Sequence, residues 1–95
     1  MFEEIKLFVI DYIKGLDVSV IIESKVVYGT NKLEYALSIE DYMASISILS
    51  DYTYDFFAIE SENMLMVKTM NFKSTEDILN QLKEDLDGFT KLKNV

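Results

Sequence analysis

The hydrophobic residues among the first fourteen positions recur at the spacing of an amphipathic helix. Charged residues gather on the opposite side, and the apolar stripe consists of Phe2, Ile5, Phe8, Val9, Tyr12 and Ile13. Glu3 and Glu4 suit the first turn of such a helix, and Lys14 suits the last. Gly15 can end it in the left-handed conformation. The pattern therefore predicts a helix over residues 2–14.

Beyond Gly15 the period of the pattern changes from 3.6 residues to two, which is typical of strands. Apolar and polar residues alternate over residues 16–23, and again over residues 33–40 after a turn signal at 29–32. Three further strands are predicted over 44–50, 54–60 and 64–72. Strands joined by only a few residues must be antiparallel neighbours, so the five are expected to form a meander.

A second amphipathic helix follows the strands. Ser74 is a good N-cap, Asp77 stands in the capping-box position, and the apolar stripe that follows is Ile78, Leu79, Leu82, Leu86 and Phe89. Gly88 is the predicted stop signal, and residues 90–95 are expected to be a frayed tail. Residues 1–95 thus form a single α+β domain: an N-terminal helix, an antiparallel meander of about five strands and a C-terminal helix, with the helices on one face.

Composition narrows the environment and the partners. The chain has no cysteine, it begins with acidic residues where a signal peptide is basic, and its apolar runs are too short to span a membrane, so a cytoplasmic location is expected. The net charge of −8 disfavours nucleic acid and anionic membrane surfaces. A basic protein partner fits this sign, although acidity also serves plain solubility.

Candidate catalytic chemistry is sparse. With no His and no Cys, nucleophiles of the Ser-His and Cys-His types and ordinary zinc sites are excluded, and the single glycines form no phosphate-binding loop. Asp51 with Asp55, and Glu60 with Glu62, are the nearest carboxylate pairs, but they lie at turns and match no calcium-loop spacing. We expect a non-catalytic binding protein that needs no cofactor or metal; an enzyme working through carboxylates alone is the remaining alternative.

The meander brings acidic turns to one end of the sheet. The start of the first strand, the end of the second and the turn between the fourth and fifth lie at the same end. The acids expected there are Asp17, Glu40, Asp41, Glu60 and Glu62, whereas Lys25, Lys32 and Lys73 fall toward the opposite end. This polarised charge favours an acidic docking surface.

Two further groups complete the candidate binding surface. Tyrosines beside acids near turns supply contact area at low entropic cost, although strand propensity also explains them. The sheet face without helices is predicted to carry Ile21, Leu49 and one apolar set from Tyr54 to Ile59. This face forms a homodimer or receives a partner, unless a helix tail or the Gly29 loop covers it. The candidate partner-binding residues are Glu40, Asp41, Tyr42, Asp51, Tyr52, Asp55, Glu60, Glu62, Ile21 and Leu49. Met64, Met66 and Met70 are expected on one face of the last strand as core filling.

In its order of elements, and in the segment ASISILSDYTYD from Ala44 to Asp55, the chain resembles the TriTu family, immunity proteins of bacterial polymorphic toxin systems. The family often has Trp where this chain has Leu49 and Gly where it has Tyr52, while Asp55 matches. The resemblance implies a protein that binds and neutralises a co-encoded toxin, and a basic toxin domain would be steered to an acidic inhibitor. The alternatives are an acidic chaperone for a secreted protein, a class that usually interrupts its sheet with a helix, and a homodimeric regulatory domain.

Overall fold

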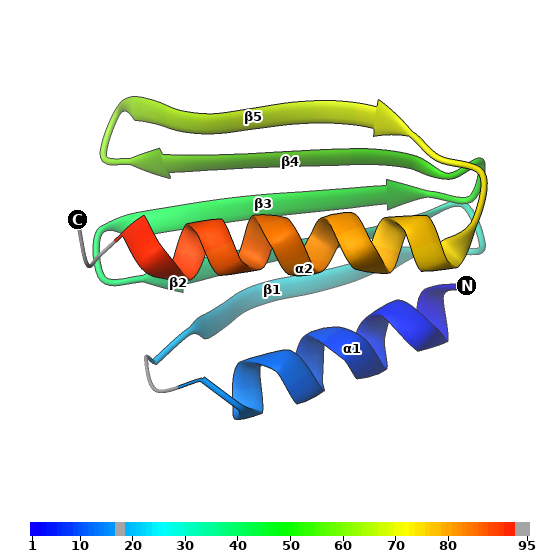
Figure 1. Ribbon diagram of the computed structural model, residues 1–95, viewed down its shortest axis with the longest axis horizontal. Coiled ribbons are helices and arrows are strands. Elements are labelled where there is room, and N and C mark those ends of the chain that lie inside the picture. Colours follow the sequence, from blue (N-terminus) through cyan, green and yellow to red (C-terminus); the bar gives the residue numbers. More distant parts are fainter. Residues whose placement is uncertain (17–18, 93–95) are drawn as a thin grey trace.

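The computed structural model describes residues 1–16 and 19–92. Its elements are, in chain order, α1 (Phe2–Lys14), β1 (Ile21–Tyr28), β2 (Lys32–Ile39), β3 (Tyr42–Leu49), β4 (Thr53–Glu60), β5 (Asn63–Asn71) and α2 (Thr75–Lys91). The strands form an antiparallel sheet in the order β1-β2-β3-β4-β5, and Figure 1 shows both helices in front of the same face. The predicted α+β class and the predicted meander are confirmed.

The hydrophobic core lies between the sheet and the helices. Cross-strand partners point to the same face of a sheet, and the register pairs Leu33 with Ile48 and Ile46 with Phe56. All four are buried, as are the sheet-facing residues of the helices, Ile5, Val9, Ile78, Leu82, Leu86 and Phe89. We call this side of the sheet the helix-facing side and the other side the open face.

The first strand differs from its prediction. β1 begins at Ile21, not at residue 16, and it continues to Tyr28. The β-forming residues Val26, Val27 and Tyr28 pair with β2 up to the turn. Asp17 and Val18, which were assigned to the strand and to the acidic end, lie outside the described residues.

Gly15 ends α1 as predicted, but not in the left-handed conformation, and the stop signal at Gly88 was wrong. Gly15 has φ −85°, in the right-handed region, and its N–H bonds to the carbonyls of Asp11 and Tyr12. Gly88 lies inside α2, where a Cβ would come within 3.3 Å of the Met66 side chain, so glycine there permits close approach of helix and sheet. The helix also includes Thr90, which is buried, so the tail does not begin at residue 90.

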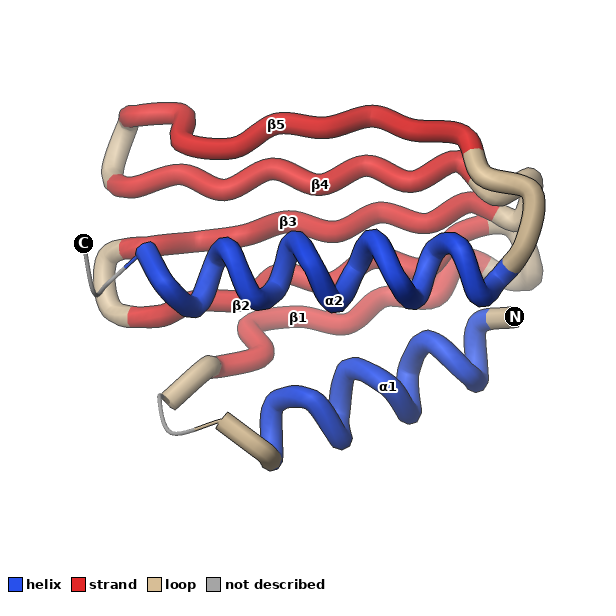
Figure 2. Tube along the Cα trace, in the orientation of Figure 1, coloured by secondary structure: helices blue, strands red, loops and turns tan. Residues whose placement is uncertain are grey.

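The N-cap of α2 was predicted correctly. The Ser74 hydroxyl accepts a hydrogen bond of 3.2 Å from the Asp77 N–H. The tube in Figure 2 shows a short loop leading from the end of β5 into this helix. Neither helix of the described part of the chain is long and apolar enough to cross a membrane.

Candidate functional site: an acidic end beside an apolar patch

Two tight turns place four carboxylates at one end of the sheet. Glu40 and Asp41 join β2 to β3, and Ser61 and Glu62 join β4 to β5; both turns lie at the left in Figure 1. Tyr42 and Glu60 are cross-strand partners between these turns. We call Glu40, Asp41, Tyr42, Glu60 and Glu62 the acidic end.

The charge of this end acts on its tyrosine. The Glu60 carboxylate beside Tyr42 raises the pKa of its hydroxyl, and burial and the charges of Asp41 and Glu40 raise it further. Tyr42 therefore lies among carboxylates whose charges add to one negative field. Such a field attracts a cationic partner and accelerates its association.

The lysines are less completely separated from these acids than predicted. Lys32 and Lys73 lie toward the opposite end, but Lys25 lies within β1, opposite Tyr35. Lys14 and Lys91 end the two helices on the same side as the acidic turns, as Figure 1 shows for the helix ends. The separation of acidic from basic residues therefore holds for the strand turns, but it does not extend through the helix layer.

Both acidic turns hold a non-glycine residue with positive φ. Glu40 has φ 52° and Ser61 has φ 56°, and each is the first residue of a two-residue hairpin loop. Loops with positive φ at this position favour glycine, because a Cβ is crowded there at a cost of about 1–2 kcal/mol per residue. Backbone strain of this kind gathers at functional sites.

An apolar patch on the open face adjoins the acidic end. The register aligns Met43 with Ile59, Ile59 with Met64, and Phe57 with Val67 across β3, β4 and β5. Four of these side chains are exposed: Met43 by 43%, Phe57 by 39%, Met64 by 58% and Val67 by 69%. We call these five residues the β3–β5 patch.

The rest of the open face limits the patch. Ser45 pairs with Phe57 on one side and with Ala36 on the other. Further along the strands, Ser47, Asp55 and Thr69 form a polar row. On the open face, the exposed apolar side chains of β3, β4 and β5 are therefore concentrated toward the acidic turns, as in interfaces that combine an apolar centre with a charged rim.

The structure brings only part of the predicted site together. Ile21 is exposed on the open face and lies in line with the patch, because its partner Ser38 also pairs with Met43. Leu49 lies at the opposite end of the open face beside Lys32. Ile21 therefore joins the acidic end, whereas Leu49 does not.

The remaining candidates, Asp51, Tyr52 and Asp55, lie away from the acidic end. Asp51 and Tyr52 form the β3–β4 turn. The Asp51 carboxylate accepts a 3.0 Å bond from the Thr53 N–H, and hydrogen bonding by Thr53 lowers the pKa of Asp51. Asp55 lies on the open face between Ser47 and Thr69. The role visible for Asp51 is to hold its turn.

Sequence reasoning found only part of the β3–β5 patch: it expected one apolar set from Tyr54 to Ile59 on the open face, but it did not place Met43, Met64 or Val67 there. A signal was present, since both last strands carry apolar residues on both faces. A register shift between Ala58 and Ile59 pairs Ile59 with Met64 while Ala58 pairs with Met66. The expectation that Met64 and Met66 share a face is therefore wrong, because the irregularity turns Met64 to the open face.

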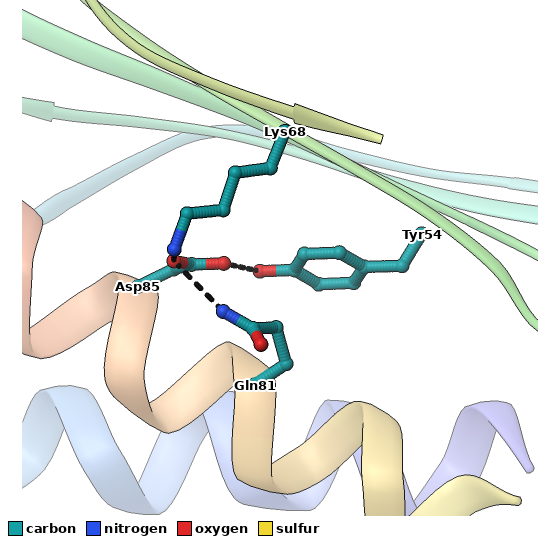
Figure 3. A network of polar contacts seen from close by, with 4 residues as sticks. All are labelled: Tyr54, Lys68, Gln81 and Asp85. Atoms are coloured by element: carbon teal, nitrogen blue, oxygen red, sulfur yellow. Dashed lines mark hydrogen bonds and ion pairs between the residues drawn. The ribbon is translucent and has the colours of Figure 1, made fainter. Parts of the chain in front are cut away.

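A polar network lies within the core, away from this surface (Figure 3). The buried Asp85 carboxylate of α2 accepts hydrogen bonds from Tyr54 at 2.6 Å, Lys68 at 2.7 Å and Gln81 at 3.2 Å. Burial, and then the bond to Asp85, raise the pKa of Tyr54, while the bond to Asp85 raises that of Lys68. The network joins α2 to β4 and β5. Tyr54 and Asp85 have no exposed surface, so the arrangement suits positioning the helix and offers no access to a substrate.

Within the described residues, no group of three or more acidic side chains is arranged to hold a metal ion. Comparison with protein-family models, with curated proteins and with solved structures finds no match to this chain. The candidate surface therefore rests on its own geometry and charge.

Proposed function

We propose that the protein is a non-catalytic binding module, an immunity protein that binds and neutralises a co-encoded, basic bacterial toxin. The observation that carries this proposal is the position of the β3–β5 patch directly beside the acidic end. Exposed apolar patches of this kind mark protein interfaces, and the adjoining carboxylates select a cationic partner.

The backbone at Tyr52 supports the resemblance to the TriTu family. This residue has φ 69°, a conformation that glycine adopts without steric cost. The family often has Gly at the matching position. The uninterrupted strand order likewise favours an immunity protein over a secretion chaperone, a class that usually interrupts its sheet with a helix.

The direct test begins with the partner. The gene upstream of this chain's gene is expressed, and binding of its product is measured by surface plasmon resonance together with inhibition of its toxicity. We expect tight binding and neutralisation. An upstream product that is not toxic, or a toxin that this protein neither binds nor blocks, would contradict the proposal.

The interface is tested by charge reversal. Replacing Glu40, Asp41, Glu60 and Glu62 by Lys is expected to slow toxin association at least tenfold at low salt and to reduce its salt dependence. The matched control makes the same change in charge at exposed helix acids, Glu4, Asp11, Glu76 and Glu84. Equal effects of both variants would show that only net charge matters, and would remove the acidic end as a docking site.

The apolar part of the interface needs its own variant. Phe57→Ser with Val67→Ser removes the centre of the β3–β5 patch while leaving every charge unchanged. We expect faster dissociation of the toxin, because apolar anchors in an interface mainly affect the dissociation rate. Unchanged dissociation in a folded double variant would place the interface elsewhere.

A further inference from the structure

β1 is an edge strand that is open on both faces. All eight of its residues are exposed, including the large apolar side chains of Ile21, Ile22, Val26, Val27 and Tyr28. An edge strand presents a row of unpaired N–H and C=O groups that can pair with another strand. The charges on this strand are Glu23, next to the irregularity at its start, and Lys25.

The helix-facing side of β1 is uncovered for a geometric reason. Ile22 and Val27 pair with Leu37 and Leu33, which are fully buried beneath the helices, yet both β1 residues are exposed. Figures 1 and 2 show α1 running beside β1 on its outer side, past the edge of the sheet. α1 therefore lies over the place where a sixth strand would pair with β1.

A pocket opens between α1 and the end of β1. It has a volume of about 400 Å³, and its lining includes Phe2, Lys6, Val27, Gly29, Thr30 and Tyr52. The space is large enough for an apolar side chain, and Val27 of β1 forms part of its wall. Tyr52, which lines it, has the left-handed backbone described above, a strain that gathers at binding sites.

We propose that the edge of β1 and this pocket form a groove that binds an extended segment of a partner protein as a sixth strand. The segment carries apolar residues at alternate positions, one of which enters the pocket. The unpaired backbone of β1 selects a strand, and the pocket selects the side chain. This groove is independent of the acidic end and the β3–β5 patch, so it adds to the proposed function without depending on it.

A second copy of the chain does not fit the groove. Antiparallel pairing of two β1 strands about a two-fold axis would place both α1 helices over the same two strands. Packed helices need about 8–10 Å between their axes, whereas neighbouring strands are about 4.8 Å apart. A single extended segment brings no helix and avoids this clash.

The other edge of the sheet provides a control. β5 also carries exposed residues, including Thr69. Figure 1 shows α2 over the middle of the sheet and neither described helix beyond β5, so a strand added there would stay exposed on its helix-facing side. Thr69→Lys places a charge on this edge on the open face, whereas Val27→Lys places one on β1 on the helix-facing side. Both positions are exposed enough to leave the fold intact.

The test uses linear peptides displayed on phage as the probe, selected on the immobilised full chain. We expect selected peptides to carry alternating apolar residues, to slow hydrogen exchange of the β1 amides, and to lose at least tenfold in affinity for Val27→Lys but not for Thr69→Lys. The proposal is overturned if no peptide is selected, if Val27→Lys binds equally well, or if protection falls on β5. It is also overturned if the wild-type chain forms a dimer that Val27→Lys dissociates. Toxin neutralisation is scored separately, so either proposal can fail alone.

Discussion

The same substitution, Tyr→Phe, is expected to have opposite effects at two buried tyrosines. The Tyr54 hydroxyl donates a 2.6 Å hydrogen bond to the buried Asp85 carboxylate. The Tyr35 hydroxyl is also buried, and the described residues provide it with no hydrogen-bond partner. Both rings are almost fully buried on the helix-facing side, so loss of the hydroxyl is the main difference between each variant and the wild type.

The magnitudes follow from the partners. A hydrogen bond to a charged group contributes about 1.5–3 kcal/mol, so Tyr54→Phe should lower the free energy of unfolding by about 2 kcal/mol. In a domain of this size that loss corresponds to a fall in Tm of about 8–16 °C. Tyr35→Phe removes a polar atom that folding leaves unpaired, so its effect should be between zero and a stabilisation of about 1 kcal/mol.

Lys68 extends this test to the charge of the network. Lys68→Met leaves the Asp85 carboxylate with only neutral hydrogen-bond donors. Breaking a fully buried ion pair costs about 3–5 kcal/mol. The Lys68 side chain is 36% exposed, so water offsets part of this loss. We expect a cost of about 2–3 kcal/mol. Replacing all three groups, with Tyr54→Phe, Lys68→Met and Asp85→Leu, should recover stability to within about 1 kcal/mol of wild type.

Urea unfolding followed by circular dichroism measures each variant. Two results would refute the reasoning. One is a Tyr35→Phe variant that is destabilised as much as Tyr54→Phe, because hydroxyl pairing would then not distinguish the two sites. The other is a triple variant no more stable than Lys68→Met alone, which would show that the network contributes more than the satisfaction of its own buried charge.

Three smaller changes test local features. Ser61→Gly should stabilise the protein by about 0.5–1 kcal/mol, since glycine adopts the observed positive φ without strain. Its control, Ser61→Ala, should show no gain in stability in the same urea titration. Gly88→Ala should stabilise by about 0.5 kcal/mol, because the helix gains up to about 1 kcal/mol in propensity and only the flexible end of Met66 must move; a loss would show that Met66 cannot yield. Burial, and then the bond to Asp87, raise the pKa of Tyr12 to about 12. The stabilisation from Tyr12 is present below the unfolded pKa of about 10 and is lost as pH rises toward about 12. Tyr12→Phe should therefore lose less stability than wild type over this interval.

The fold could be predicted from the sequence because its signals are local and agree with one another. The helical stripe of α1, the Ser74 cap and the alternation in β2 and β3 each depend on neighbouring residues. The prediction of Gly88 was wrong because the role of this residue depends on packing between elements. Gly88 reads as a stop signal, but in the structure it lets Met66 approach α2.

The acidic end could be predicted because topology alone determines it. Any antiparallel meander with these turns brings Glu40, Asp41, Glu60 and Glu62 to one end. The predicted separation of charge failed in part because helix direction also matters. Both helices run toward the same end, and their last turns carry Lys14 and Lys91 there.

The full β3–β5 patch could not be predicted, because its residues from β5 depend on register. Ile21 and Leu49 are both on the open face, as expected, but they lie at opposite ends of the sheet. A strict period of two also places Met64 with Met66 in the core. The irregularity beside Ile59 reverses the face of Met64, and the resulting row of Met43, Ile59 and Met64 lies against the acidic turns. One extra residue in β5 thus converts a predicted core position into part of the surface that we propose as the docking site.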